Sequence, residues 1–89
     1  MSVYVDAAYV RWKGGRWCHL FADTTTELDA FAQRIGLKTS WRQKSGSALE
    51  HYDVNESKRA TAVTHGAIEI DRTKLLGMIE RKRIMEVKR

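Results

Sequence analysis

The apolar runs of this chain are short, and two of them are closed by an aspartate. The run 3–5 ends at Asp6, and the run 17–22 ends at Asp23. Apolar runs of this length, bounded by polar residues, are typical of short strands in a small sheet. A carboxylate at the end of a buried strand points into the crevice where open α/β sheets bind ligands. The pattern therefore predicts a sheet and a candidate site at its edge.

Turn and capping signals predict the remaining elements. A Gly-Gly pair predicts a hairpin turn, and three polar caps predict three helices. The expected strands are 3–6, 9–12, 17–21 and 67–70, and the expected helices follow Thr24, Asp53 and Asp71. We predict an α/β or α+β fold, a small single domain of three to four short strands with three helices packed on the sheet. Residues 1–80 form this domain, and residues 81–89 form a basic C-terminal helix end or tail.

The charge of the chain is concentrated at its end. Of the net charge of +5, residues 81–89 contribute +4, because they hold five Lys or Arg and one Glu. Residues 1–80 hold eleven Lys or Arg and ten Asp or Glu, which leaves +1. Nucleic-acid binding is therefore expected only through the tail. The single cysteine, Cys18, rules out an internal disulfide, no apolar run reaches membrane-spanning length, and we predict a cytoplasmic protein.

Five stretches of the sequence carry a family resemblance. They are VYVD (3–6), HLFAD (19–23), ELDAFAQRIGL (27–37), HYD (51–53) and KRATAVTHGAIEI (58–70). In this order they resemble the phage and bacterial family named domain of unknown function 4031. In some bacteria that domain is joined to an HD-type phosphohydrolase domain, so the resemblance implies nucleotide chemistry by association. The chain departs from the family in having Ala7-Ala8 after VYVD and a longer linker over 44–50.

The candidate site gathers polar and aromatic side chains from these stretches and from the irregular segment 38–50, which we expect to be a mobile binding loop. Its members are Asp6, His19, Asp23, Trp41, His51, Tyr52, Asp53, Lys58 and Arg59. His19 and the triplet 51–53 are expected to contact polar groups of a ligand. Lys58 and Arg59 are expected to bind its phosphate near a helix start, and Trp41 is expected to cover it.

This site predicts a phage-type accessory domain that binds a phosphate-bearing, nucleotide-like small ligand and needs no cofactor. Interference with host defence is a use that suits a phage protein of this size. Each residue also has a structural interpretation, in which Asp6 closes a turn and Asp23 and Asp53 cap helices. His65, beside a glycine at a helix end, is expected to be structural.

Two further classes of function stay open. The first is a metal-dependent phosphoesterase or nuclease, with Mg²⁺ on Asp6 and Asp23, or with a metal held by His19, His51, Asp23 and Asp53. The second is an interaction module, in which the tryptophans and the basic tail bind DNA, a host protein or a second copy of the chain. Three tryptophans with arginines beside them resemble a stacking platform for bases.

Overall fold

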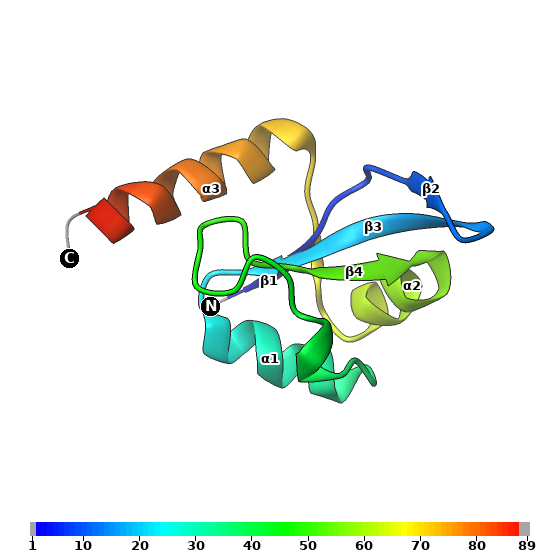
Figure 1. The fold of residues 1–89 in the computed structure, drawn as a ribbon. Helices are drawn as coiled ribbons and strands as arrows, with labels where there is room; N and C mark the ends of the chain where they lie inside the picture. The colour runs from blue at the N-terminus through cyan, green and yellow to red at the C-terminus, as the bar shows by residue number, and fades with distance from the viewer. Residues whose placement is uncertain (1, 88–89) are drawn as a thin grey trace.

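The centre of the fold is β3 (Gly15–Ala22), which pairs along both of its edges. In the computed structural model, which describes residues 2–87, β1 (Val3–Val5) and β2 (Val10–Trp12) pair antiparallel with one edge of β3. β4 (Tyr52–Asn55) pairs antiparallel with the other edge, and β5 (Ile68–Glu69) runs parallel to β1. The described residues thus form one five-stranded sheet; one helix connects β3 to β4, a second connects β4 to β5, and a third follows β5 (Figure 1).

β1 and β2 are two parts of one strand that a bulge interrupts. Val5 pairs with Leu20 and Val10 pairs with Trp17, so the four residues 6–9 face only the two residues 18–19 of β3. We call this segment the 6–9 bulge. Bulges bend a strand and re-aim its side chains, and they are common beside functional sites.

A two-residue turn joins β2 to β3. Trp12 pairs with Gly15, which leaves Lys13 and Gly14 as the turn residues, with φ of 48° and 74°. Two positive φ values define a type I′ turn, whose twist matches that of the flanking strands. The hairpin predicted from the Gly-Gly pair is confirmed.

α1 (Thr25–Arg34) and α2 (Glu56–Thr64) cover one face of the sheet (Figure 1). α1 begins at the predicted capping box, because Thr24 Oγ1 accepts a hydrogen bond of 3.2 Å from the backbone N–H of Glu27. The buried core between these helices and the sheet consists of Val5, Cys18, Leu20, Ala22, Leu28, Phe31, Ala32, Ile35, Leu37, Tyr52, Val54, Ala62 and Ala67. A short 3₁₀ helix, η1 (Thr39–Trp41), follows α1.

The second helix starts later than the sequence predicts. Asp53 lies inside β4 and does not cap α2; the cap is Asn55, whose Oδ1 accepts the N–H of Lys58 at 2.8 Å. The physical reason is the alternation within β4, where Tyr52 and Val54 enter the core while Asp53 points to the other face. The expected α+β class is confirmed, and β4 brings the strands of the described part to five.

α3 (Arg72–Val87) lies on the opposite side of the sheet from α1 (Figure 1). Asp71 caps it as predicted, since its Oδ1 accepts the N–H of Lys74 at 2.8 Å. The basic segment expected as a helix end or tail continues α3 as far as Val87, and residues 88–89 lie outside the described part. None of the helices in that part has the length and apolar character needed to cross a membrane.

Candidate metal centre

Strand alternation separates the side chains of β3 into two sets. Cys18 and Leu20 point into the core, whereas Trp17, His19 and Phe21 point to the face opposite α1 and α2. The register of β4 sets Asp53 directly across from His19. His51 comes two residues before Asp53 and therefore shares its face.

Three of these side chains turn polar atoms toward one point. Asp53 Oδ1 lies 3.4 Å from His51 Nε2 and 3.9 Å from His19 Nε2, and each of the three residues offers a ligand atom within 4.8 Å of the other two. The two imidazole rings meet edge to face with centroids 5.1 Å apart. Zinc lies about 2.0–2.2 Å from nitrogen and oxygen ligands, so ligand atoms on one ion are about 3.4 Å apart. Small side-chain rotations would bring the three atoms to that spacing.

The 6–9 bulge delivers a carboxylate to His19. Asp6 Oδ2 lies 2.7 Å from Nδ1 of the ring, and Asp6 Oδ1 accepts the backbone N–H of His19 at 2.8 Å. Burial alone would raise the pKa of Asp6, but the hydrogen bonds from His19 outweigh burial and lower it. The hydrogen bond to Asp6 raises the pKa of His19, against the lowering effect of burial. Because an ionised carboxylate can only accept, Nδ1 of His19 carries a proton and Nε2 is left for a metal in the neutral ring.

His51 and Asp53 are oriented in the same manner. His51 Nδ1 lies 2.7 Å from the carbonyl oxygen of Leu49, which can only accept, so Nδ1 donates and Nε2 faces Asp53. Asp53 Oδ2 accepts a hydrogen bond from the side-chain amide of Gln43, which leaves Oδ1 directed at the histidines. Every group of the candidate centre therefore has a partner that fixes its orientation.

The segment expected as a mobile loop is anchored at several points. Gln43 and His51 form an isolated antiparallel bridge, with two backbone hydrogen bonds of 2.8 and 3.1 Å. The buried carboxylate of Glu50 accepts from Thr25 Oγ1 at 2.6 Å and from the backbone N–H of Gly46 at 2.9 Å. These contacts hold the segment that carries Gln43, the Leu49 carbonyl and His51.

Asp23, the fourth metal ligand considered from the sequence, lies elsewhere. Its carboxylate accepts from the backbone N–H of Ser2 at 3.0 Å and from the Tyr4 hydroxyl at 3.1 Å. Because β1 and β3 are antiparallel, Asp6 and Asp23 follow opposite ends of the pair. They therefore do not form the shared Mg²⁺ site that adjacent strand ends would provide.

The expected phosphate contacts have partners within the protein. Lys58 Nζ donates to the carbonyl oxygen of Ile35 at 2.6 Å, at the end of α1. Arg59 Nε donates to the backbone carbonyl of Asp6 at 2.9 Å, and its Nη1 lies 2.9 Å from Glu69 Oε1. Arg59 thus supports the 6–9 bulge from beneath the candidate centre.

The two aromatic residues expected in the site lie away from the histidines. Tyr52 is fully buried on the core face, and its hydroxyl donates to Asp29 Oδ1 at 2.7 Å. Burial, with the neighbouring carboxylate of Asp29, raises the pKa of Tyr52 to about 12. Trp41 is half exposed in η1, where Lys38 Nζ lies 5.6 Å from its ring centroid.

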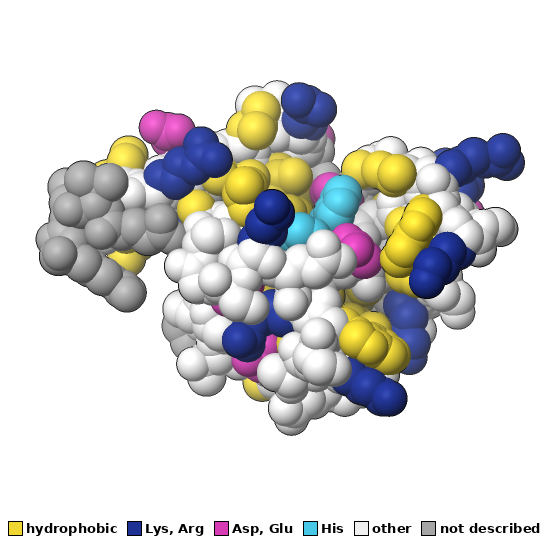
Figure 2. All heavy atoms as spheres, in the orientation of Figure 1, with side chains coloured by type: hydrophobic (Ala, Val, Ile, Leu, Met, Phe, Trp, Pro, Cys, Tyr) yellow, Lys and Arg dark blue, Asp and Glu magenta, His cyan; other side chains and the backbone are white. Residues whose placement is uncertain are grey.

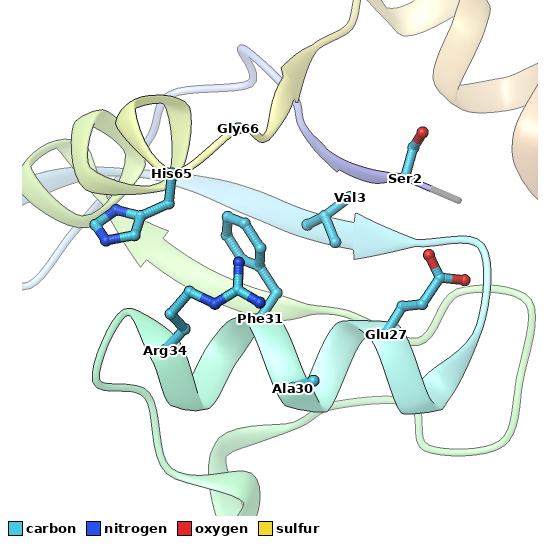
Figure 3. Close-up of a pocket in the computed structure, with 8 residues that line it drawn as sticks. All are labelled: Ser2, Val3, Glu27, Ala30, Phe31, Arg34, His65 and Gly66. Atoms are coloured by element: carbon cyan, nitrogen blue, oxygen red, sulfur yellow. The ribbon is translucent and has the colours of Figure 1, made fainter.

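A separate hollow of about 320 Å³ opens between α1, β1 and the end of α2 (Figure 3). Arg34 and His65 lie at one end of it and Glu27 at the other (Figure 3). His65 Nδ1 is 2.9 Å from the Thr61 carbonyl oxygen, a helix-end contact that agrees with the structural role expected for it. The metal-ligand set lies elsewhere, on the face opposite α1, so we place the candidate site there.

Gln43, the Leu49 carbonyl and Glu50 were not predicted as part of the site. A backbone carbonyl carries no sequence signal, and a glutamine in a polar segment is common. The partnership between Asp6 and His19 was also not predicted, because it depends on the bulge. The HYD triplet (51–53) was the one useful sequence signal for this centre, since a His and an Asp two residues apart on a strand share a face.

The chain matches a protein-family model. The model described as "Protein of unknown function (DUF4031)" matches residues 3–82 of the 89-residue chain. No curated protein and no solved structure matches the chain. The matched region contains every group of the candidate centre, from Asp6 to Asp53.

Proposed function

The chain belongs to this family of unknown function, DUF4031, and we propose that it binds a divalent transition metal at His19, His51 and Asp53 and uses it to hydrolyse a phosphate ester. The observation that carries the proposal is the support behind each ligand. The Asp6 carboxylate orients His19, the Leu49 carbonyl orients His51, and the Gln43 amide orients Asp53. Such outer partners are typical of metal-binding histidines and carboxylates.

The ligand types favour a transition metal over Mg²⁺. Two imidazoles and one carboxylate suit Zn²⁺ or Fe²⁺, whereas Mg²⁺ prefers carboxylates, water and phosphate oxygens. Three protein ligands leave a position for water, as in catalytic zinc sites. Zn²⁺ held by these residues would supply a Lewis acid that makes a bound water more acidic and so a better nucleophile near neutral pH.

A phosphate ester suits the charged groups around the histidines. Residues 1–80 carry a net charge of only +1, so the local arrangement of charge matters more than the total of +5. Figure 2 shows the histidines near the middle of one face, with an acidic side chain beside them and Lys or Arg side chains around them. A Lewis-acid metal would stabilise the charge that develops on the phosphoryl oxygens. The cytoplasm is the proposed compartment, because the one cysteine, Cys18, is a free and fully buried thiol.

Zinc titration tests the metal half of the proposal. Isothermal titration calorimetry should give one Zn²⁺ per wild-type chain, and His51→Ala and Asp53→Asn should each weaken binding more than about 100-fold, beyond the effect of losing an outer partner. His65→Ala is the matched control, because His65 lies at the end of α2 and should leave zinc binding unchanged. Wild-type binding no stronger than that of Asp53→Asn would overturn the metal site.

Turnover tests the hydrolytic half. The zinc- or manganese-loaded protein should hydrolyse bis(p-nitrophenyl) phosphate, and both EDTA and Asp53→Asn should abolish the reaction. Circular dichroism of each variant checks that the fold is retained. A protein that binds zinc and shows no turnover above Asp53→Asn would leave the metal site standing and refute the hydrolysis.

A further inference from the structure

An aromatic pair lies on the same sheet face as the candidate centre. Trp17 comes two residues before His19 on β3, and Trp12 lies directly opposite Gly15, a further two residues back. Side chains on one face of a strand lie about 7 Å apart along it, so Trp17, the nearer member of the pair, lies one such step from His19. Figure 2 shows hydrophobic side chains beside the histidines over this part of the sheet.

The pair is held in a fixed arrangement. The indole N–H of Trp17 donates to the carbonyl oxygen of Trp12 at 2.8 Å, and the two rings meet edge to face with centroids 5.1 Å apart. The type I′ turn at Lys13 and Gly14 fixes the register that sets Trp12 over Gly15. Even so, Trp12 is 49% exposed and Val10, opposite Trp17, is 53% exposed. An exposed apolar surface on a rigid hairpin indicates a binding site.

Cations lie at the turn of the hairpin and on its other face. Lys13 Nζ lies 4.6 Å from the Trp12 ring centroid. Arg11 and Arg16 are cross-strand partners on the other face of the hairpin, where Arg16 meets Glu56 of α2, and like charges directly opposite one another destabilise a sheet. Within a hollow of about 530 Å³ at the hairpin, these three cations meet one carboxylate, that of Glu56, which lies 3.7 Å from Arg16. An anionic partner would relieve the excess positive charge.

From this juxtaposition we infer that the β2–β3 hairpin binds a single-stranded nucleic acid around its end, with a base stacked on Trp12 and phosphates near Lys13 at the turn and near Arg11 and Arg16 on the α2 face. Aromatic rings combined with cations along a strand surface are the features that bind single strands without sequence preference. Trp12 lies two side-chain steps, about 14 Å, from His19 along the sheet, so a phosphodiester further along the same strand would lie beside the metal ligands. That the bound nucleic acid is also the substrate rests on the proposed function. The phosphate ester that is hydrolysed would then be a phosphodiester of the nucleic acid.

Fluorescence anisotropy with a fluorescein-labelled dT10 oligonucleotide tests the inference, in EDTA and at low salt. Trp12→Ala should weaken binding between about 5-fold and about 150-fold, since a stacked base contributes about 1–3 kcal/mol. Trp41→Ala is the matched control, because Trp41 is exposed to the same degree on η1 and should change binding less than 2-fold. Trp12→Phe, which keeps an aromatic face, should retain most of the affinity.

The two proposals fail separately. Asp53→Asn should lose zinc and keep dT10 binding in EDTA, and Trp12→Ala should keep its zinc affinity. Equal effects of Trp12→Ala and Trp41→Ala would overturn the nucleic-acid inference. So would the absence of wild-type binding at a protein concentration of about 10⁻⁴ M, which is high enough to detect even non-specific complexes.

Discussion

The Asp6 carboxylate performs two roles that are usually separate. In an unbroken ladder, a carbonyl of the neighbouring strand would accept the backbone N–H of His19. The 6–9 bulge removes that carbonyl, and Asp6 Oδ1 accepts the N–H instead at 2.8 Å. The second oxygen of the same carboxylate holds the imidazole ring at 2.7 Å. Backbone pairing and ligand orientation are thus satisfied by one side chain.

Asp6→Asn should therefore weaken zinc binding about 10- to 100-fold, the usual effect of losing an outer partner. The asparagine keeps the size of Asp6 but would present an amide N–H₂ or an uncharged oxygen to the His19 ring. Competition with a chromophoric chelator measures the zinc affinity. Asp23→Asn makes the same change at the other strand end and should have no effect, and equal losses in the two variants would contradict the role given to Asp6.

Tyr52 should make the protein sensitive to alkali. Its pKa is raised from 10.0 to about 12, first by burial and then by Asp29. The folded state therefore holds the phenolic proton more tightly than the unfolded state, and this contribution to stability is lost as pH rises from 10 to 12. We expect a loss on the order of 2 kcal/mol, which Tyr52→Phe removes. Urea unfolding at pH values from 9 to 12 gives the comparison, and parallel pH profiles for the two proteins would refute it.

At the scale of elements, the side chains of α3 that the structure describes as buried, Met78 and Ile79, lie in its first half. Met78 is 3% exposed, whereas Met85, two turns further along, is 63% exposed. Met78→Ala should lower the free energy of unfolding by about 2–5 kcal/mol, because it leaves a cavity. Met85→Ala should change it by less than about 0.5 kcal/mol. Chemical denaturation of both variants measures the difference, and similar values would mean that α3 does not pack through Met78.

Elements whose signals are local could be predicted from the sequence. The turn at Lys13 and Gly14, the capping box at Thr24 and the cap at Asp71 each depend on residues within four positions of one another. β4 could not be predicted, because it has only four residues and its Asp53, three before Glu56, imitates a helix cap.

Part of the candidate site was predictable. His19, Asp23, His51 and Asp53 were expected around one pocket, and the first, third and fourth of these converge whereas Asp23 lies with Ser2 and Tyr4. Whether Asp6 or Asp23 joins them depends on the direction in which β1 pairs with β3, and an isolated run of three apolar residues does not encode that direction. The 6–9 bulge is likewise defined by two registers, which no single segment contains.

For the whole molecule, the candidate centre exists only in the folded chain. Its ligands and their partners come from three separate segments, β1 with its bulge, β3, and residues 43–53, so the unfolded chain lacks the site. At a zinc concentration 100 times the Kd, binding should stabilise the folded state by about 2.7 kcal/mol. For a domain of this size that corresponds to a rise in Tm of about 10–20 °C.

Thermal unfolding with zinc and with EDTA measures this rise. Asp53→Asn should show no zinc-dependent rise, while its Tm in EDTA should stay close to that of the wild type, because Asp53 is a partly exposed side chain outside the core. An equal rise in the two proteins would place the zinc elsewhere.

The 6–9 bulge gives the chain one point where its length can change. The register of β1 is set by Val5 in the core, and that of β2 is set by the turn at Lys13 and Gly14. Neither register depends on the number of residues between them, and Ala7 and Ala8 are exposed. An insertion or deletion there would move the carboxylate that holds His19 while the core keeps its pairing. Proteins with this fold could therefore change the candidate centre by insertions or deletions in the bulge, without substitution of any metal ligand.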